Sequence, residues 1–483
     1  MNGRASEILM QDFEGRLHAM RKTKIICTIG PASENPATLE RFARVPNGSK
    51  EDVDCAVEAA RRALPSWSAT PLLKRVELMK SMLAHFKASE STVVDLLVKE
   101  LGAPIAFART KHFGFQTIRT QSYIDLVQTI PFEQKLTQST VYHEPVGVVA
   151  CVTPWNYPIG QVVQKIVPAV LTGNTVVLKP SQHTPLSVYL MIDAFEKAGF
   201  PKGVVNLVSG KGAQLGDYLA THPGVDMLSF TGSTRVGKLL AQSALGGVKR
   251  ISLELGGKSP FVWLPGIQDY RPAVRKLYDS IFMNTGQTCT ALSRLVVPRS
   301  ELAAIEAVLV EEAARYTVGD TMDEATLIGP LSSRAQFNKV KEYIELGLQE
   351  GARLILGEVP RHCDNGYYVK PTIFSDVKNA MCIAQEEIFG PVLCVIPYDT
   401  VEEAIAIAND TVYGLSAAVW GPNKKEAVVV AKSIRSGNVY INDGPRDVTA
   451  PFGGMKESGL GREAGVPGLL EFTEFKAIFD AGQ

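Results

Sequence analysis

The chain has 483 residues, with 50 Lys plus Arg and 50 Asp plus Glu, so its formal net charge is zero. Hydrophobic residues make up 45% and charged residues 21%, which is ordinary for a folded protein and excludes an intrinsically disordered chain. The balanced charge argues against nucleic acid as a partner, because phosphate contacts favour a basic excess. At about 150 residues per domain, this length predicts two to four domains.

The apolar and cysteine patterns predict a cellular location. The longest apolar stretches, such as 146–155, are shorter than the ~18–20 residues that span a bilayer, so we expect no membrane contact. The N-terminus has no apolar core of the signal-peptide kind. The seven cysteines form no C-x-x-C pair, which predicts reduced thiols, no metal site and a cytoplasmic protein.

The first predicted elements are helices. Ser49, with Asp52 three residues later, is an N-cap signal, and apolar residues then recur at helical spacing until Pro65. A second helix is expected over 72–86, and a third begins near Ser91. Residues 20–33, ahead of these helices, resemble the first strand of pyruvate kinase, but nothing downstream continues that fold.

Short β-rich runs then alternate with helices. The first series has expected strands at 147–152, 175–178, 203–208 and 227–230, and expected helices at 187–198 and 212–221. The second series, after Gly257, has expected strands at 261–264, 294–297, 372–374, 392–397, 417–420 and 437–442. This alternation is typical of βαβ units, so we predict an α/β fold with two doubly wound parallel sheets.

Four motifs directly follow expected strands, at the edge where open α/β sheets bind ligands. Glycine-rich turns at 210–216 and 231–237 could bring backbone N–H groups to a pyrophosphate, or could be plain turns. Lys179 could hold ribose or phosphate, or could be solvated. In Pro-Trp-Asn-Tyr-Pro at 154–158, the prolines would aim the amide of Asn156 as an oxyanion hole requires; a structural turn is the alternative.

Two further side chains have the character of a base and a nucleophile. Glu254 ends a β-run with apolar neighbours, which would raise the pKa of its carboxyl and suit a general base, unless a nearby Lys or Arg pairs with it. Cys289 alone among the cysteines is preceded by Gly-Gln and flanked by threonines. These small neighbours would leave its sulfur accessible, as a nucleophile requires. The alternative is that Cys289 is a small buried thiol without a catalytic role.

Seven motifs occur together in one order. They are PWNYP at 154–158, KPS at 179–181, FTGSTRVG at 230–237, ELGGK at 254–258, GQTC at 286–289, EEIFGP at 386–391 and PFGG-x-KESGLGRE at 451–463. In this order they resemble the NAD(P)-dependent aldehyde dehydrogenase superfamily, over residues of about 35–480.

The resemblance implies roles for individual residues. Cys289 would be a nucleophile of low pKa and Glu254 the general base, while Asn156 and the backbone N–H of Cys289 would form the oxyanion hole. Lys165 and Glu463 match positions that the family associates with proton relay. The implied cofactor is NAD, with NADP as an alternative, and the implied cofactor-binding residues are Thr153, Pro154, Trp155, Lys179, Ser181, Gln182, Gly212, Phe230, Thr231, Gly232, Ser233, Val236, Leu255, Gly256, Glu387 and Phe389. Tyr157, Gln161, Gln164, Thr288, Thr290 and the loop 443–449 are expected to line the substrate tunnel.

The family fold also implies a division of the chain. It comprises an atypical N-terminal segment (1–34), a cofactor-binding domain (35–126 and 146–256), a catalytic domain (257–445), a return segment to the cofactor cleft (446–465) and an oligomerisation arm (127–145 and 466–483). A period-2 run at 134–144 is expected to form one strand of the arm. A homodimer or homotetramer is the implied assembly.

One position departs from the family pattern, and others distinguish between kinds of family member. Gln182 stands where NAD-preferring members usually carry Glu, and a neutral amide would not repel the 2′-phosphate of NADP. Arg446 could pair with a substrate carboxylate, or could be solvated. Glu254 argues against a CoA-acylating relative, and the presence of both Glu254 and Cys289 argues against a non-catalytic one. The expected substrate is a small or medium aldehyde.

Overall fold

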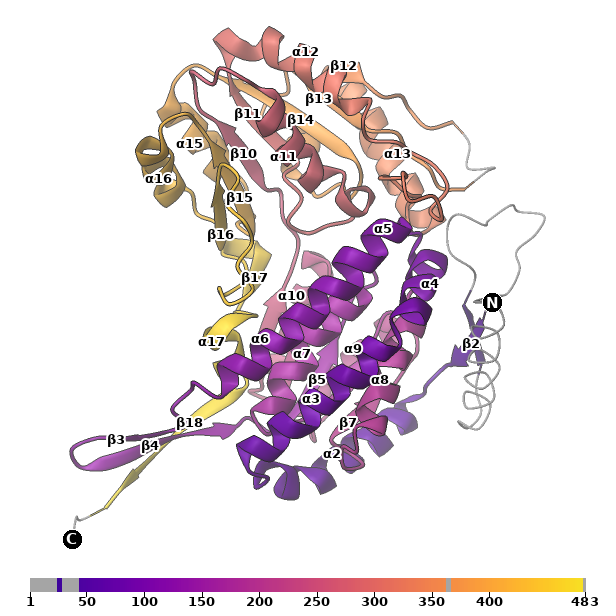
Figure 1. The fold of residues 1–483 in the computed structure, drawn as a ribbon, viewed down its shortest axis with the longest axis vertical. Helices are drawn as coiled ribbons and strands as arrows, with labels where there is room; N and C mark the ends of the chain where they lie inside the picture. The colour runs from indigo at the N-terminus through magenta and orange to yellow at the C-terminus, as the bar shows by residue number, and fades with distance from the viewer. Residues whose placement is uncertain (1–23, 28–42, 362–365, 481–483) are drawn as a thin grey trace.

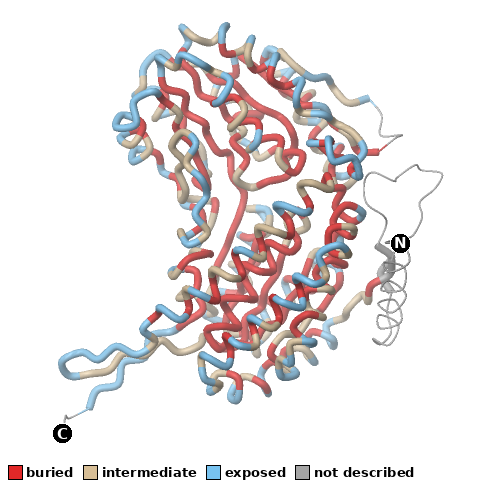
Figure 2. The backbone as a smooth tube through the Cα atoms, viewed as in Figure 1, coloured by how far each residue is buried: buried red, intermediate tan, exposed pale blue. Residues whose placement is uncertain are grey.

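The computed structural model describes residues 24–27, 43–361 and 366–480. Figure 1 shows two bodies joined side by side, each built on a twisted sheet, and a narrow arm that extends from one of them. The buried backbone is concentrated in the two sheets and in the helices packed on them (Figure 2). Both large sheets consist mainly of parallel strands, which confirms the predicted α/β fold class.

The first sheet has six strands in the order β17-β9-β8-β5-β6-β7. All its neighbours are parallel except β17, which pairs antiparallel with β9. Every residue of β5, β6 and β8 is buried, as expected for strands covered by helices on both faces. The bounds are β5 Val148–Val152, β6 Thr175–Lys179, β7 Val205–Leu207, β8 Met227–Thr231, β9 Arg250–Glu254 and β17 Gly459–Leu460.

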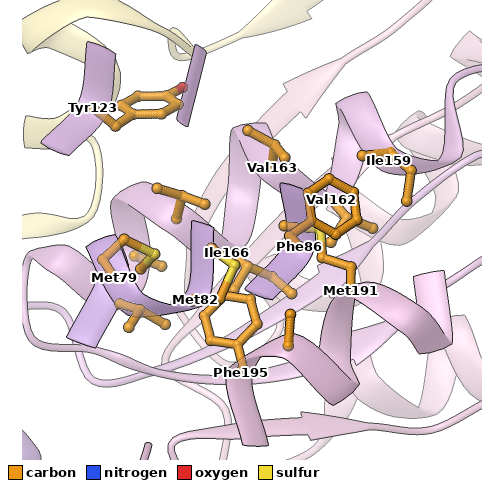
Figure 3. Packing of buried hydrophobic residues seen from close by; sticks show 14 of the residues in the cluster. Met79, Met82, Phe86, Tyr123, Ile159, Val162, Val163, Ile166, Met191 and Phe195 are labelled. Carbon is orange, nitrogen blue, oxygen red and sulfur yellow. The ribbon is translucent and has the colours of Figure 1, made fainter. Parts of the chain in front are cut away.

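Helices cover both faces of this sheet (Figure 1). They are α2 Lys50–Ser68, α3 Leu72–Ala88, α4 Glu90–Leu101, α5 Ile105–Phe107, the π-helical turn η1 Ala108–Gly114, α6 Phe115–Val127, α7 Pro158–Leu171, α8 Leu186–Lys197, α9 Gly212–Thr221, α10 Thr234–Leu245 and α17 Gly465–Leu470. Every residue of α7 is buried. Figure 3 shows Ile159, Val162 and Ile166 of α7 packed among side chains of α3 and α8, so α7 is a rigid support for any site at its N-terminus.

The first helix extends beyond its expected end. The capping box of Ser49 and Asp52 is present, but α2 continues through Pro65 to Ser68. Trp67 in this last turn is buried, and its indole N–H donates to the carbonyl of Val170 (3.2 Å). This tertiary anchor keeps the chain helical where proline alone would favour an end.

The second sheet has seven strands in the order β12-β13-β14-β11-β10-β15-β16. The six expected strands are parallel, and the edge strand β12, which is antiparallel, was not predicted. The strands are β10 Pro260–Trp263, β11 Arg294–Pro298, β12 Arg353–Leu356, β13 Thr372–Ser375, β14 Val392–Tyr398, β15 Ser416–Trp420 and β16 Asn438–Ile441. Its helical segments are α11 Arg271–Ile281, η2 Met283–Gly286, η3 Arg299–Glu301, α12 Leu302–Ala313, α13 Arg334–Gln349, α14 Cys382–Gln385, α15 Val401–Asn409 and α16 Lys424–Ser433, and η4 Lys456–Ser458 precedes β17.

The arm is a three-stranded antiparallel sheet (Figure 1). The prediction of a single strand over 134–144 was wrong, because the chain turns back between β3 (Glu133–Lys135) and β4 (Ser139–Pro145). The N–H of Leu136 donates to the carbonyl of Ser139 (2.8 Å) and closes that turn. The last strand, β18 (Thr473–Phe479), pairs with β4 over its full length.

At the N-terminus, β1 (Lys24–Cys27) pairs antiparallel with β2 (Ala43–Pro46). The rest of the pyruvate-kinase-like stretch and of the segment 1–34 lies outside the described residues. Among the helices that the structure describes, none is long and apolar enough to cross a membrane.

Candidate active site

A cavity of about 800 Å³ lies at the carboxyl ends of β5, β6 and β8. In this sheet the chain runs from β5 outward through β6 and β7, and then returns to the other side of β5 with β8 and β9. The strand order therefore reverses between β5 and β8. Such a switch point is where open α/β sheets bind ligands.

All of the predicted cofactor-binding residues line this cavity, together with Asn156, Gln161 and Cys289. Other lining residues were not predicted. These are Val152, His183, Asp217, Arg235, Leu239, Leu240, Gln242, Ser243, Gln336 and Lys339. Val152 ends β5, His183 follows the KPS motif, and Arg235 lies within the turn 231–237, whereas the others reach the cavity through the packing of α9, α10 and α13.

The cavity wall has features that fit an anionic dinucleotide. Ser233 caps α10 through its hydroxyl, which accepts from the N–H of Val236 (3.4 Å), so the positive end of the helix dipole faces the cavity. Burial lowers the pKa of the Lys179 ammonium to about 8, which leaves a desolvated cation beside the cavity. A Cβ on Gly232 would lie 2.5 Å from the Phe230 ring, so this turn requires glycine.

The opposite wall is formed by the loop after α14. Glu387 accepts from the N–H of Gly257 (3.1 Å), and burial raises the pKa of its carboxyl. Phe389, with a φ of 63°, sets its ring edge-on to that of Trp155 at 5.6 Å. The side-chain amide of Gln336 donates to the Phe389 carbonyl (2.8 Å) and holds this strained residue in place. The two bodies thus meet across the cavity.

A left-handed turn precedes Cys289. Asn284, Thr285 and Gly286 have φ values of 51°, 57° and 73°. A β-branched residue in this region is unusual, and such strain of ~1–3 kcal/mol persists only where the surroundings enforce it. A Cβ on Gly286 would lie 2.1 Å from the carbonyl oxygen of Gly390, so the turn admits only glycine there.

Hydrogen bonds tie Asn156 to this turn. Its Nδ2 donates to the carbonyl of Gln287 (2.9 Å), and its own carbonyl accepts from the amide of Asn284 (2.9 Å). The side chain of Asn156 is buried, and Nδ2 carries a second hydrogen that this contact does not use. The amide is therefore fixed within two residues of Cys289, in the wall of the same cavity.

The Cys289 thiol does not have the low pKa that the sequence analysis expected. Burial raises its pKa to about 12, and the negative charges of Glu387 and Glu254 act in the same direction. The positive charge of Arg446 opposes them. The resting sulfur is thus a thiol, and it needs a nearby base to become a nucleophile.

Glu254 ends β9 in a pocket without polar partners. Both carboxylate oxygens are buried and have no hydrogen-bond partner among the described residues. Burial raises the pKa of this carboxyl well above its usual range, and the charge of Glu463 adds to the shift. A Cβ on Gly453, whose φ is 148°, would lie 2.6 Å from Oε1, so the return segment packs directly on the carboxyl. The ion-paired alternative for Glu254 is not what the structure shows.

Lys165 and Glu463 form a buried ion pair beside this carboxyl. Nζ of Lys165 lies 2.7 Å from Oε1 of Glu463, and the two side chains are 0% and 2% exposed. Nζ also donates to the hydroxyl of Ser229 (3.2 Å). Gln164 donates to the other oxygen of Glu463 (2.6 Å), so this predicted tunnel residue instead supports the ion pair.

The predicted substrate-binding residues do not all line the large cavity. Gln161 lines the large cavity. The hydroxyl groups of Tyr157 and Thr288 lie 2.9 Å apart. Thr288 directly precedes Cys289 in the chain, and Thr290, which directly follows it, is partly exposed. Within the described part of the chain, no three His, Cys, Asp or Glu side chains are placed to hold a metal ion.

Comparison with known proteins agrees with this geometry. The model of the aldehyde dehydrogenase family matches residues 31–478. A 3-succinoylsemialdehyde-pyridine dehydrogenase from a Pseudomonas species is 44% identical over 92% of this chain and 94% of its own length. A variant of aldehyde dehydrogenase C from Pseudomonas syringae, in complex with NAD+ and octanal, is 43% identical with a TM-score of 0.92, over 95% of this chain and 94% of that one. An aldehyde dehydrogenase of Mycobacterium tuberculosis in complex with NAD+ is 39% identical with a TM-score of 0.90, over 94% of each chain. The chain therefore belongs to the aldehyde dehydrogenase family, as its ordered motifs predicted.

Proposed function

We propose that the protein oxidises a small or medium aldehyde to the carboxylic acid with NAD, through a thioester on Cys289. One observation carries the proposal: Cys289 lines the cavity beside the fixed amide of Asn156, with the partnerless carboxyl of Glu254 within electrostatic range. An aldehyde panel tests it, with NAD or NADP and with absorbance of the reduced nicotinamide as the readout. Absence of turnover with every aldehyde would refute it.

The cavity fits NAD by its lining and its size, since ligand sites commonly measure about 300–1,000 Å³. Lys179 would hold the adenosine ribose, the capped end of α10 at Ser233 the pyrophosphate, and Glu387 the nicotinamide ribose. Trp155 and Phe389 would cover the cofactor from opposite walls. When bound, NAD supplies a hydride acceptor that converts the thiohemiacetal to a thioester.

The chain's own groups perform the addition step. The Cys289 thiol must lose its proton, and Glu254 would take it, because its charge acts on the thiol and its raised pKa makes it a stronger base than an ordinary carboxylate. The sulfur then forms a bond to the carbonyl carbon, and the carbonyl oxygen gains the negative charge. The free hydrogen of Asn156 Nδ2 and the backbone N–H of Cys289 would stabilise that charge.

The same carboxyl serves the hydrolysis of the thioester. Glu254 takes a proton from water, the water oxygen bonds to the acyl carbon, and the C–S bond breaks to release the acid and the Cys289 sulfur. The Lys165–Glu463 pair, buried next to Glu254, would carry the proton onward. Because neither carboxylate oxygen of Glu254 has a hydrogen-bond partner among the described residues, both oxygens are available to accept the proton from water.

Replacing Asn156 with alanine should lower kcat by ~10²–10³-fold, because one oxyanion donor is lost. Asn156→Asp has the same size but no N–H donor, so it should lose a similar factor. Titration with NAD should show unchanged binding in both variants. A decrease of less than about threefold in kcat would remove Asn156 from the mechanism.

Gln182 lines the cavity next to Ser181 and His183, and we expect it to admit the 2′-phosphate of NADP. The ratio of kcat/KM for NAD to that for NADP should stay below ~10³ in the wild type. Gln182→Glu adds a negative charge facing that phosphate and should raise the ratio by tenfold or more. A wild-type ratio above ~10³ would contradict this expectation.

The domain division predicted from the sequence, the assembly and the location stay proposals. The arm exposes Leu136, Phe475 and Phe479 (52%, 74% and 78%), which supports a role in pairing with a second copy as a dimer or tetramer. Five cysteines whose side chains the structure describes, Cys55, Cys151, Cys289, Cys382 and Cys394, are free thiols, which supports a reducing compartment such as the cytoplasm.

A further inference from the structure

Two arginine side chains lie against one aromatic ring. The guanidinium carbon of Arg119 is 4.9 Å from the centre of the Phe115 ring, and that of Arg446 is 5.6 Å from it. Phe115 and Arg119 are one turn apart on α6 and so share a face of the helix. Arg446 reaches the ring from the segment 446–465 and also lies 4.9 Å from the centre of the Phe452 ring. Two cations held this close repel each other unless an anion lies nearby.

The surrounding side chains do not neutralise this pair. Arg119 is 5% exposed, its Nη1 donates to the uncharged Gln116 (2.7 Å), and its buried Nε has no hydrogen-bond partner in the described residues. Arg446 is exposed and, within the described chain, forms neither an ion pair nor a hydrogen bond. The adjacent Asp447 instead accepts from the N–H and hydroxyl of Thr449 (2.8 and 2.7 Å).

The carboxylate whose charge acts on Arg119 is already engaged. This is Glu463, which raises the pKa of Arg119 only in part against the larger effects of burial and Arg446. Both oxygens of Glu463 are occupied by Lys165 and Gln164, at 2.7 and 2.6 Å. The arginine pair therefore keeps a net positive charge, with Arg119 buried and Arg446 exposed.

The pair lies near the nucleophile. Cys289 packs against the apolar cluster that contains Phe452, and Arg446 lies over the ring of that phenylalanine. The positive charge of Arg446 accordingly lowers the pKa of both Cys289 and Tyr157. Neither arginine, nor Phe115, is part of the wall of the cofactor cavity. A dinucleotide in that cavity would therefore not contact either guanidinium group.

We propose that Arg119 and Arg446 together bind the anionic end of the substrate, and that the preferred aldehydes carry a carboxylate at the end opposite to the carbonyl. This inference rests on the proposed function, in which Cys289 attacks the carbonyl carbon. Guanidinium groups bind carboxylates with paired, charge-assisted hydrogen bonds, and the adjacent Phe115 and Phe452 rings limit the water that would screen them. An uncharged aldehyde would leave both cations unpaired.

The test compares ω-oxo acids of four, six and eight carbons with the alkanals of the same lengths. At the chain length that spans the distance from Cys289 to the arginines, the wild type should favour the oxo acid by roughly 10–100-fold in kcat/KM. Arg446→Gln and Arg119→Gln should each lower this preference by about tenfold or more, mainly through KM for the oxo acid. Arg435→Gln, which removes another exposed arginine outside the cavity wall, should preserve it.

Arg446 is exposed, so its replacement tests the idea even where loss of the buried Arg119 unfolds the chain. A wild type that oxidises alkanals as well as oxo acids at every length would overturn the inference. So would a preference that Arg446→Gln leaves unchanged. In both cases the proposed function would stand, because alkanal turnover would continue; absence of turnover with all substrates would instead refute the proposed function, and with it this inference.

Discussion

Replacing Cys289 with alanine should abolish aldehyde oxidation, with a loss of about 10⁴-fold or more in kcat. The loss follows because, among the described residues, no other cysteine lines the cavity, and because addition of the sulfur begins the reaction. Binding of NAD should be unchanged, since the remaining cavity wall is intact. Steady-state absorbance of the reduced nicotinamide measures the first effect, and titration with NAD measures the second.

Cys55→Ser is the matched control. Cys55 is an exposed free thiol on α2, so its replacement should leave kcat within about twofold of the wild type. Substantial turnover by the Cys289→Ala variant, with its fold intact, would exclude the sulfur from the mechanism.

Replacing Glu254 with glutamine should lower kcat by ~10²–10⁴-fold, because the general base for thioester hydrolysis is lost. The raised pKa of this carboxyl also fixes the sign of the pH dependence. Below that pKa the carboxyl is protonated and cannot accept a proton, so wild-type kcat should rise with pH through a value above the ordinary carboxyl range. The Glu254→Gln variant should lose this limb of the profile.

Glu471 provides a matched control for Glu254. It is partly buried, burial raises the pKa of its carboxyl too, and its charge acts on Glu254, but it does not line the cavity. Glu471→Gln should therefore keep the rising limb of the pH profile. If Glu254→Gln retains both kcat and that limb, a different group is the base.

The sequence was sufficient for the parts of the fold that follow from local pattern. The strands β5, β6 and β8 are short apolar runs followed by turn residues, and their covering helices have the matching period. Motifs placed directly after these strands also located the cavity, because the carboxyl ends of parallel strands meet at one edge. The edge strand β12 was not predicted, since four residues, three of them half-buried and one exposed, show no alternation of apolar and polar side chains.

The site depended on tertiary packing that spacing cannot reveal. Gln336 and Lys339 reach the cavity from α13, far from every motif in the sequence. The left-handed turn at Asn284 and Thr285 could not be predicted from the sequence, because residues other than glycine rarely have a positive φ. The raised pKa of Cys289 comes from burial and from the carboxylates of Glu254 and Glu387, which the chain assembles from distant segments.

The arginine pair illustrates the same limit. Arg446 alone in a loop is an ordinary solvated cation, and Arg119 in a helix is an ordinary surface residue by its sequence. Only the folded chain brings both to the ring of Phe115 and buries Arg119. A charge pair of this kind is therefore a property of the fold and not of a motif.

If the proposed mechanism holds, a covalent thioester forms on the sulfur of Cys289, and mass spectrometry of the wild-type enzyme, quenched with acid before the first turnover is complete, detects it. After mixing with NAD and an aldehyde and rapid acid quench, the intact mass should rise by that of the acyl group. Digestion should place the added mass on the peptide that contains Cys289. An acyl group on a different cysteine, or reduced nicotinamide formed without any covalent adduct, would contradict the account.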